Sequence, residues 1–279
     1  MRYTPQECVP GALTPGTRQP RMIGPTVIAS TVTERPVSLR LLGPTHLPGF
    51  APGALPGRAV ELLTYLHLHP GSSGVQVQHA LWPDRFDTAS GHVRTLAKRT
   101  RSALGHDHDG RPWLPEATKA GYRLHPALTS DWSNFQRLIG PNPAQTPTSA
   151  LCAAVRLVGG QPLDGITRRA GWWTWRGPIE ETMIDAVLTA AAELFRRSMD
   201  IGRLSDARTA ATIARSTDPL NETGWRMELT LAMRRGDPDA YTRVVAELRA
   251  ALGPIPTLDP ATRHLLAHAP AALRKPRRP

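Results

Sequence analysis

Apolar residues recur at helical spacing in three successive stretches of the first half of the chain. In "GRAVELLTYLHLHPG" (57–71) they form one stripe, which a His-Pro-Gly sequence ends. "GVQVQHALWPD" (74–84) predicts a second, shorter helix that stops at its proline. "SGHVRTLAKRTRSALG" (90–105) predicts the third helix, with Gly105 as its C-terminal cap. The residues available to cap its N-terminus are Asp87, Thr88 and Ser90.

Short strand patterns flank these three helices. "VSLRLLGPTHLPG" (37–49) alternates briefly and breaks at Gly-Pro, which predicts short strands and a turn. "RPWLPEATKAGYRLHP" (111–126) predicts a hairpin of two short strands with Lys119 near its tip. Strands, three helices and a hairpin in this order are typical of a winged helix-turn-helix. An α+β domain is therefore expected first.

The second half is predicted to be almost wholly helical. "DWSNFQRLI" (131–139) and "SALCAAVRLVGGQPLDG" (149–165) predict helices, with the linker 141–148 between them. From Ile179 onward a repeat of the tetratricopeptide type appears at offsets of 33 or 34 residues, which predicts two helix pairs over 178–252. The residues that carry this repeat are Gly202, Ala207, Ala211, Ala214 and Pro219, then Trp225, Gly236, Ala240 and Val244.

These patterns divide the chain into four parts. Residues 1–36 contain regularly spaced prolines and predict a flexible arm. Residues 37–127 form the expected winged helix-turn-helix, and residues 128–268 form an all-α domain that resembles tetratricopeptide repeats. Residues 269–279 form a basic tail.

The charge of the chain favours a polyanionic partner. The formal net charge is +11 at pH 7, although charge alone says nothing about the fold. The two cysteines, Cys8 and Cys152, suit a reducing compartment, and no stretch resembles a signal peptide or a membrane span. A cytoplasmic protein with no membrane partner is expected.

The third helix separates into an apolar and a basic face. On a helical wheel Val93, Ala97, Thr100 and Leu104 fall in the apolar arc. The opposite face carries basic and hydroxyl side chains, which can contact base edges and phosphates in the DNA major groove. The alternative is an ordinary solvated face. The position of the helix before a hairpin favours DNA.

Several of these sequence stretches resemble those of a known protein family. The order "ELLTYLHLHPG", "HALWPD", "HVRTLAKRTRSALG" and "AGYRL" resembles the OmpR-type winged helix of the Streptomyces antibiotic regulatory proteins. The second half is similar to their bacterial transcriptional activator domain, through "GQPLDG", "DPLNE" and "LRAALG". The resemblance covers about 37–266. It implies a DNA-binding transcriptional activator that recruits RNA polymerase, often as a homodimer.

The resemblance places function on particular residues. In the family, the hairpin after the third helix is called the wing, and here it corresponds to 113–124. The expected contacts to double-stranded DNA come from the third helix and this wing, namely Arg94, Thr95, Lys98, Arg99, Arg101, Ser102, Lys119 and Arg123. The expected polymerase contacts lie after the second helix, at Trp82, Asp84 and Arg85. At Thr100 the family usually has leucine. A hydroxyl there can bond a carbonyl one turn back, but it packs less surface.

Other motifs suggest no catalytic or metal chemistry. His67 and His69 do not share a helix face, and "HDHD" (106–109) lies in a turn without a second ligand cluster. Adjacent Glu180 and Glu181 suit a helix start. "GWWTW" (171–175) is expected to pack against the helices from Ile179 onward, although a ligand cage or base-stacking platform is the alternative. We find no Walker A, G-x-S-x-G or H-E-x-x-H sequence, and expect neither an enzyme nor a cofactor.

A second hypothesis belongs to another functional class. In it the winged helix is degenerate, and the groove of the helical repeat binds a peptide. The polar Thr100 and the modest charge of the first domain favour this reading, whereas the basic helix face and the wing oppose it.

Overall fold

The computed structural model describes residues 37–50, 53–83, 89–166 and 175–273. The expected arm 1–36, the residues Asp84, Arg85, Asp87 and Thr88, most of the tryptophan-rich segment and the basic end 274–279 lie outside the described residues. In the first half the elements are β1 (Ser38–Leu39), α1 (Ala59–Leu68), α2 (Gly74–Leu81) and α3 (Ala89–Leu104). They are followed by β2 (Thr129–Ser130), α4 (Asp131–Ile139), η1 (Pro143–Gln145), α5 (Thr148–Val155), α6 (Arg176–Asp200), α7 (Leu204–Thr217), α8 (Glu222–Arg235), α9 (Pro238–Leu252), η3 (Ile255–Thr257), α10 (Pro260–Ala267) and η4 (Ala271–Leu273).

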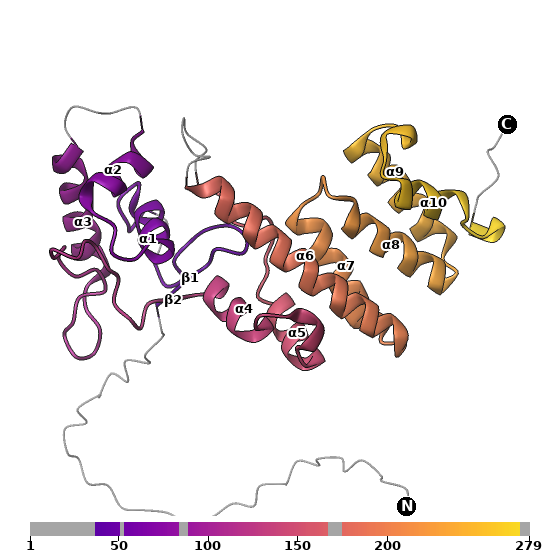
Figure 1. Ribbon diagram of the computed structural model, residues 1–279, viewed down its shortest axis with the longest axis horizontal. Helices are drawn as coiled ribbons and strands as arrows, with labels where there is room; N and C mark the ends of the chain where they lie inside the picture. The colour runs from indigo at the N-terminus through magenta and orange to yellow at the C-terminus, as the bar shows by residue number, and fades with distance from the viewer. Residues whose placement is uncertain (1–36, 51–52, 84–88, 167–174, 274–279) are drawn as a thin grey trace, which may run out of the picture. The chain divides into compact units, whose positions relative to one another are not determined.

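The three helices of the first half form where the apolar pattern predicts them (Figure 1). Helix α1 buries Leu62, Leu63 and Leu66 completely. Helix α2 begins with a capping box, in which Ser73 and Gln76 bond each other's backbone nitrogens. Helix α3 is followed by Gly105 with a positive φ of 70°, as its capping role requires.

The expected hairpin does not form as two strands, which corrects the prediction for 111–126. Isolated bridges take their place, between Thr118 and Gly121 and between Ser72 and Tyr122. Prolines at 112, 115 and 126 lack the backbone N–H that a paired strand needs, and this limits the ladder. The segment still closes a turn with Lys119 at its tip, so we keep the name wing for residues 113–124.

The first strand segment is held by residues from the second half of the chain. Strand β1 pairs in parallel with β2, with Ser38 opposite Thr129. The carboxylate of Asp131, at the start of α4, accepts the backbone N–H groups of Leu41 at 2.8 Å and of Leu42. Burial raises the pKa of Asp131, and these hydrogen bonds to its charged form oppose that shift.

Residues in and next to the "GQPLDG" segment (160–165) also form hydrogen bonds with the stretch that follows β1. The amide of Leu163 donates to the carbonyl of Leu41 at 2.8 Å, and the amide of Gly159 donates to the carbonyl of Leu42. Leu163 is itself buried and has a positive φ of 57°, which is unusual for a residue other than glycine. The backbone of residues 159–163 therefore holds the stretch that directly follows β1.

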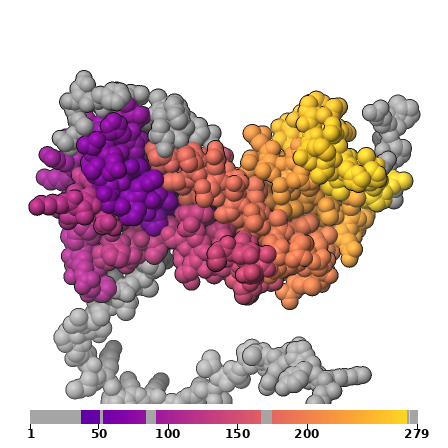
Figure 2. All heavy atoms as spheres, viewed as in Figure 1, coloured from indigo at the N-terminus to yellow at the C-terminus, as the bar shows by residue number. Residues whose placement is uncertain are grey.

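Helices α6 to α9 pack in sequence order, each against the next (Figure 1). The repeat residues Ala207, Ala211 and Ala214 of α7 are fully buried. A Cβ at Gly224 of α8 would lie 2.5 Å from the Arg215 nitrogen, so glycine permits the close approach of α7 and α8. Helices α9 and α10 pack against α8 and share a smaller core with it. Figure 2 shows the outer surface of this last part of the chain in orange and yellow.

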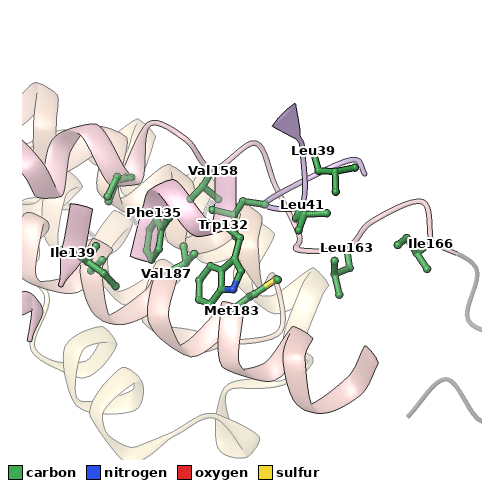
Figure 3. Packing of buried hydrophobic residues seen from close by; sticks show 14 of the residues in the cluster. Leu39, Leu41, Trp132, Phe135, Ile139, Val158, Leu163, Ile166, Met183 and Val187 are labelled. Atoms are coloured by element: carbon green, nitrogen blue, oxygen red, sulfur yellow. The ribbon is translucent and has the colours of Figure 1, made fainter. Parts of the chain in front are cut away.

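The larger core runs through both predicted domains. It includes Leu39 and Leu41 from the first half together with α4 and α6 from the second. Trp132 stacks on Phe135 with ring centroids 5.7 Å apart, and Figure 3 shows Met183 of α6 beside Trp132. The boundary between residues 127 and 128 stays a prediction, because no break in the core marks it.

Among the described residues, none of the helices combines the length and the apolar character needed to cross a bilayer.

Candidate nucleic-acid interface

Helix α3 divides into the two faces that its sequence predicts. Val93, Ala97 and Leu104 are buried against the domain, and Thr100 is buried with them. The opposite face is exposed to solvent and carries five of the expected DNA contacts, which are Arg94, Thr95, Lys98, Arg99 and Ser102. Because three of these are cations and no acid of α3 lies among them, the face can contact phosphates and guanine edges together.

Arg101 of α3 is less exposed than these residues, because its guanidinium is bonded to the wing. Its Nε donates to the carbonyl of Leu114 at 2.7 Å, and its Nη2 donates to the carbonyl of Pro115 at 3.1 Å. The guanidinium also reaches Glu116 at 3.4 Å, and the side chain is only 21% exposed. The structure therefore places Arg101, one of the expected DNA contacts, as a link between α3 and the wing, apart from the exposed cations Arg94 and Lys98.

The wing carries the two remaining basic residues. Lys119 lies in the turn between Thr118 and Gly121, and both Lys119 and Arg123 are exposed. The amide of Tyr122 donates to the carbonyl of Ser72 at 2.8 Å, and the amide of Gly71 donates to the carbonyl of Tyr122 at 2.8 Å. These bonds fix the wing to the turn between α1 and α2, so its cations have a defined place in the domain.

A hollow lies between α3 and the wing. Arg94, Lys98 and Ser102 line it on the helix side, and Glu116 and Tyr122 line it on the wing side. Glu116 is the acid in this lining, and its side chain is 88% exposed. Carboxylates accept hydrogen bonds from cytosine N4 and repel phosphates, so Glu116 favours a base edge over the DNA backbone at this point.

Thr100 is the polar residue in the buried face of α3. The residue is 0% exposed, and its hydroxyl has no hydrogen-bond partner among the described residues. The bond to a carbonyl one turn back, which the sequence allowed, is therefore not made. An unpaired buried hydroxyl lowers stability, so this position weakens the packing of α3.

We expect Thr100→Val to raise the free energy of unfolding by about 1–2 kcal/mol, because it removes the desolvated hydroxyl and adds apolar contact. Urea unfolding followed by circular dichroism measures the change. Thr95→Val on the exposed face is the matched control and should leave stability unaltered. A loss of stability in Thr100→Val would mean that the hydroxyl contributes to the native state.

Trp82 is the one expected polymerase contact that lies among the described residues. It packs between Arg58 and His92. The guanidinium of Arg58 lies 4.7 Å from the centre of its ring, and His92 of α3 lies beside it at 6.2 Å. The ring is half-buried, so this residue also links α2 to α3. Asp84 and Arg85 lie outside the described residues.

The histidine-rich segments serve local structure. The Asp107 carboxylate accepts the backbone N–H groups of Asp109 and Arg111, and it lies 3.2 Å from His125 Nε2. Asp107, His108 and Asp109 come within 4.8 Å of one another, but these bonds already use the Asp107 carboxylate to shape the turn. His67 bonds the Ser130 hydroxyl at 2.8 Å, and burial lowers the pKa of His67.

Trp175 and the residues after it form a junction that the local sequence pattern does not predict. The indole Nε1 donates to the carbonyl of Ala80 in α2 at 3.2 Å, and its ring meets Tyr65 of α1 edge-on at 5.4 Å. Trp175, the described member of "GWWTW", shares a buried core with α6, where the sequence predicts its packing, and it also contacts α1 and α2. The rest of the segment lies outside the described residues.

Arg176 and Glu180 form a buried ion pair at the start of α6. Arg176 Nε donates to Glu180 Oε2 at 3.0 Å, and both side chains are almost fully buried. Arg176 also donates to the carbonyl of Ile166, and Gln161 donates to Glu180 at 3.3 Å. From the sequence alone, Glu180 is expected only to suit a helix start. The spacing R-x-x-x-E was the signal that could have revealed this pair.

A solved structure resembles most of this chain. It is EmbR of Mycobacterium tuberculosis in complex with a low-affinity phosphopeptide, at 22% sequence identity and a TM-score of 0.52. The match covers 86% of this chain and 68% of that one. No protein-family model and no curated protein matches the chain. The likeness shows that the two proteins share a fold, of the type expected from the resemblance to the Streptomyces antibiotic regulatory proteins.

Proposed function

We propose that this protein is a transcriptional regulator that binds double-stranded DNA through α3 and the wing. The observation that carries the proposal is the exposed basic face of α3, with Arg94, Lys98 and Arg99, beside a wing whose Lys119 is fixed at a turn. A helix of this kind fits the major groove, and a neighbouring turn can reach the adjacent backbone. The shared fold supports the same conclusion at the level of architecture.

The roles of the basic residues follow from their surroundings. Arg94, Lys98, Thr95 and Ser102 lie on the exposed part of α3 and are proposed to contact bases. The phosphate contacts are assigned to Arg99, Lys119 and Arg123. Arg101 is proposed to act mainly as the link that positions the wing, because its donors are already used by wing carbonyls.

Activation is the second part of the proposal. It rests on the resemblance of the helical half to the bacterial transcriptional activator domain, which implies recruitment of RNA polymerase and a homodimer on DNA. The polymerase contacts are proposed around Trp82, Asp84 and Arg85. We propose that the protein works in the cytoplasm, without an enzymatic activity or a cofactor of its own.

Selection from a pool of random duplex DNA, followed by fluorescence anisotropy at several salt concentrations, tests the proposal. We expect a repeated sequence motif to enrich, and log K to fall by about 0.9 for each phosphate contact per log unit of salt. Arg94→Ala/Lys98→Ala should cost about 1–3 kcal/mol of binding free energy for each base contact removed. The matched control is Arg234→Ala/Arg249→Ala, which removes the same charge from exposed positions on α8 and α9.

The proposal fails if no motif enriches even at low salt. It also fails if the Arg94→Ala/Lys98→Ala protein binds the selected duplex as tightly as the control does. Circular dichroism of both variants ensures that a loss of affinity is not a loss of the folded state.

A further inference from the structure

We propose that Glu116 of the wing recognises a cytosine, as one half of a G·C base pair that the hollow between α3 and the wing reads. This inference rests on the proposed DNA binding and names the base that the site selects. Arg94, Lys98 and Ser102 line the helix side of the hollow, and Glu116 lines the wing side. A carboxylate repels the phosphates that the surrounding cations attract. An acid at this position is therefore useful only against a base.

The backbone next to Glu116 is held against α3. Arg101 of α3 donates to the carbonyl of Leu114 at 2.7 Å and to that of Pro115 at 3.1 Å. These two residues directly precede Glu116, and Leu114 is fully buried. Arg101 Nη1 also donates to Glu116 Oε1 at 3.4 Å. The carboxylate therefore has a defined place beside the exposed face of α3, and such preorganisation favours recognition of a single base.

Most of the Glu116 side chain remains available to a ligand. It is 88% exposed. The contact with Arg101 uses Oε1, and Oε2 forms no hydrogen bond with any residue that the structure describes. An ionised carboxylate only accepts hydrogen bonds, so the group of the DNA that meets Oε2 must be a donor.

The two sides of the hollow match the major-groove edge of a G·C pair. Guanine presents the acceptors O6 and N7, which arginine and lysine bind, and cytosine presents the N4 amino donor, which a carboxylate binds. Guanine O6 and thymine O4 are acceptors that would repel Glu116, and adenine N6 is a donor with the acceptor N7 beside it. The hollow therefore favours guanine on the side of Arg94 and Lys98 and cytosine on the side of Glu116.

Parallel selections from a pool of random duplex DNA, on the full chain and on Glu116→Gln, test this inference. We expect the motif of the original protein to contain a base pair at which replacement of the cytosine lowers affinity about tenfold. Glu116→Gln should lose this preference and favour adenine there, because glutamine bonds adenine N6 and N7 together. Fluorescence anisotropy with four duplexes that differ only at this base pair measures the change. A merely structural role of Glu116 would not exchange one base for another.

Further variants separate base recognition from general effects of charge. Lys119→Gln removes a proposed phosphate contact from the same wing, so it should weaken binding to all four duplexes alike and leave the motif unchanged. Glu181→Gln makes the matched charge change at an exposed position of α6 and should alter neither affinity nor motif. Urea unfolding of Glu116→Gln should match that of the original protein, because the contact between Glu116 and Arg101 is exposed to solvent.

Three outcomes would overturn the inference. They are a motif without a position that requires cytosine, the same motif for Glu116→Gln as for the original protein, and a loss of affinity in Glu116→Gln that is equal for all four duplexes. A loss of the cytosine preference supports the inference, whichever base replaces it. If the original protein enriches no motif, the DNA proposal fails and this inference fails with it. If it enriches a motif that Glu116→Gln leaves unchanged, the DNA proposal stands and only this inference fails.

Discussion

Replacing Arg176 with methionine should lower the free energy of unfolding by about 3–5 kcal/mol, because it leaves the Glu180 carboxylate buried without its counter-charge. Arg176 and Glu180 have side chains that are only 4% and 6% exposed. The carbonyl of Ile166 loses a donor in the same substitution. Urea unfolding followed by circular dichroism at pH 7 measures the loss.

Two comparisons separate the buried charge from the loss of a long side chain. Arg176→Met/Glu180→Gln should recover part of the lost stability, because the remaining amide is neutral and can still meet Gln161. Arg196→Met makes the same change in the same helix, where the arginine is 60% exposed, and its effect should be much smaller. Equal effects at Arg176 and Arg196 would refute the argument.

The site of this ion pair matters for the proposed function. Trp175 directly precedes it and bonds α2 through the carbonyl of Ala80. Partial loss of the pair should therefore loosen the contact between the start of α6 and α2 before the rest of α6 unfolds. The indole of Trp175 is one of seven in the chain, so its environment is best followed by NMR of selectively labelled tryptophan.

Local sequence features predicted the helices well. Helices α1, α2 and α3 form where the apolar stripes and the Gly, Pro and Ser signals place them, since both kinds of signal act within a few residues. The helical wheel likewise predicted the buried face of α3, and Thr100 belongs to that face. The start of α6 was placed too late, and this hid the pairing of Arg176 with Glu180.

The features that the sequence did not predict depend on contacts between residues that are distant along the chain. The pairing of β1 with β2 and the bonds from Leu41 to Asp131 join segments about 90 residues apart, and no local pattern specifies them. Arg101 follows the spacing of Arg94 and Lys98, yet the carbonyls of the wing hold it. The guanidinium of a long arginine side chain bonds whichever acceptors the fold places within its reach. A helical wheel therefore predicts only the direction of the Cα–Cβ bond, and not the position of the guanidinium.

Gly121→Ala should lower the free energy of unfolding by about 3 kcal/mol and weaken the binding of DNA. Gly121 has a φ of +83°, and a Cβ there would lie 2.2 Å from the carbonyl oxygen of Gly71 and 2.6 Å from that of Ser72. Both obstacles are backbone atoms, so the wing must move away from the turn between α1 and α2. The movement breaks the bonds between Tyr122 and this turn and displaces Lys119 and Arg123.

Gly110→Ala distinguishes this collision from backbone strain alone. Gly110 has a similar φ of +76°, but no atom lies within 4 Å of the position of its Cβ. It should cost about 1 kcal/mol and leave DNA affinity unchanged, because only the left-handed backbone is penalised. Anisotropy with a selected duplex, read beside urea unfolding, gives both quantities for each variant. Equal stability and equal DNA binding of the two glycine variants would contradict this prediction. The wing would then not depend on its close contact with Gly71, and its cations would have no fixed position from which to contact phosphates.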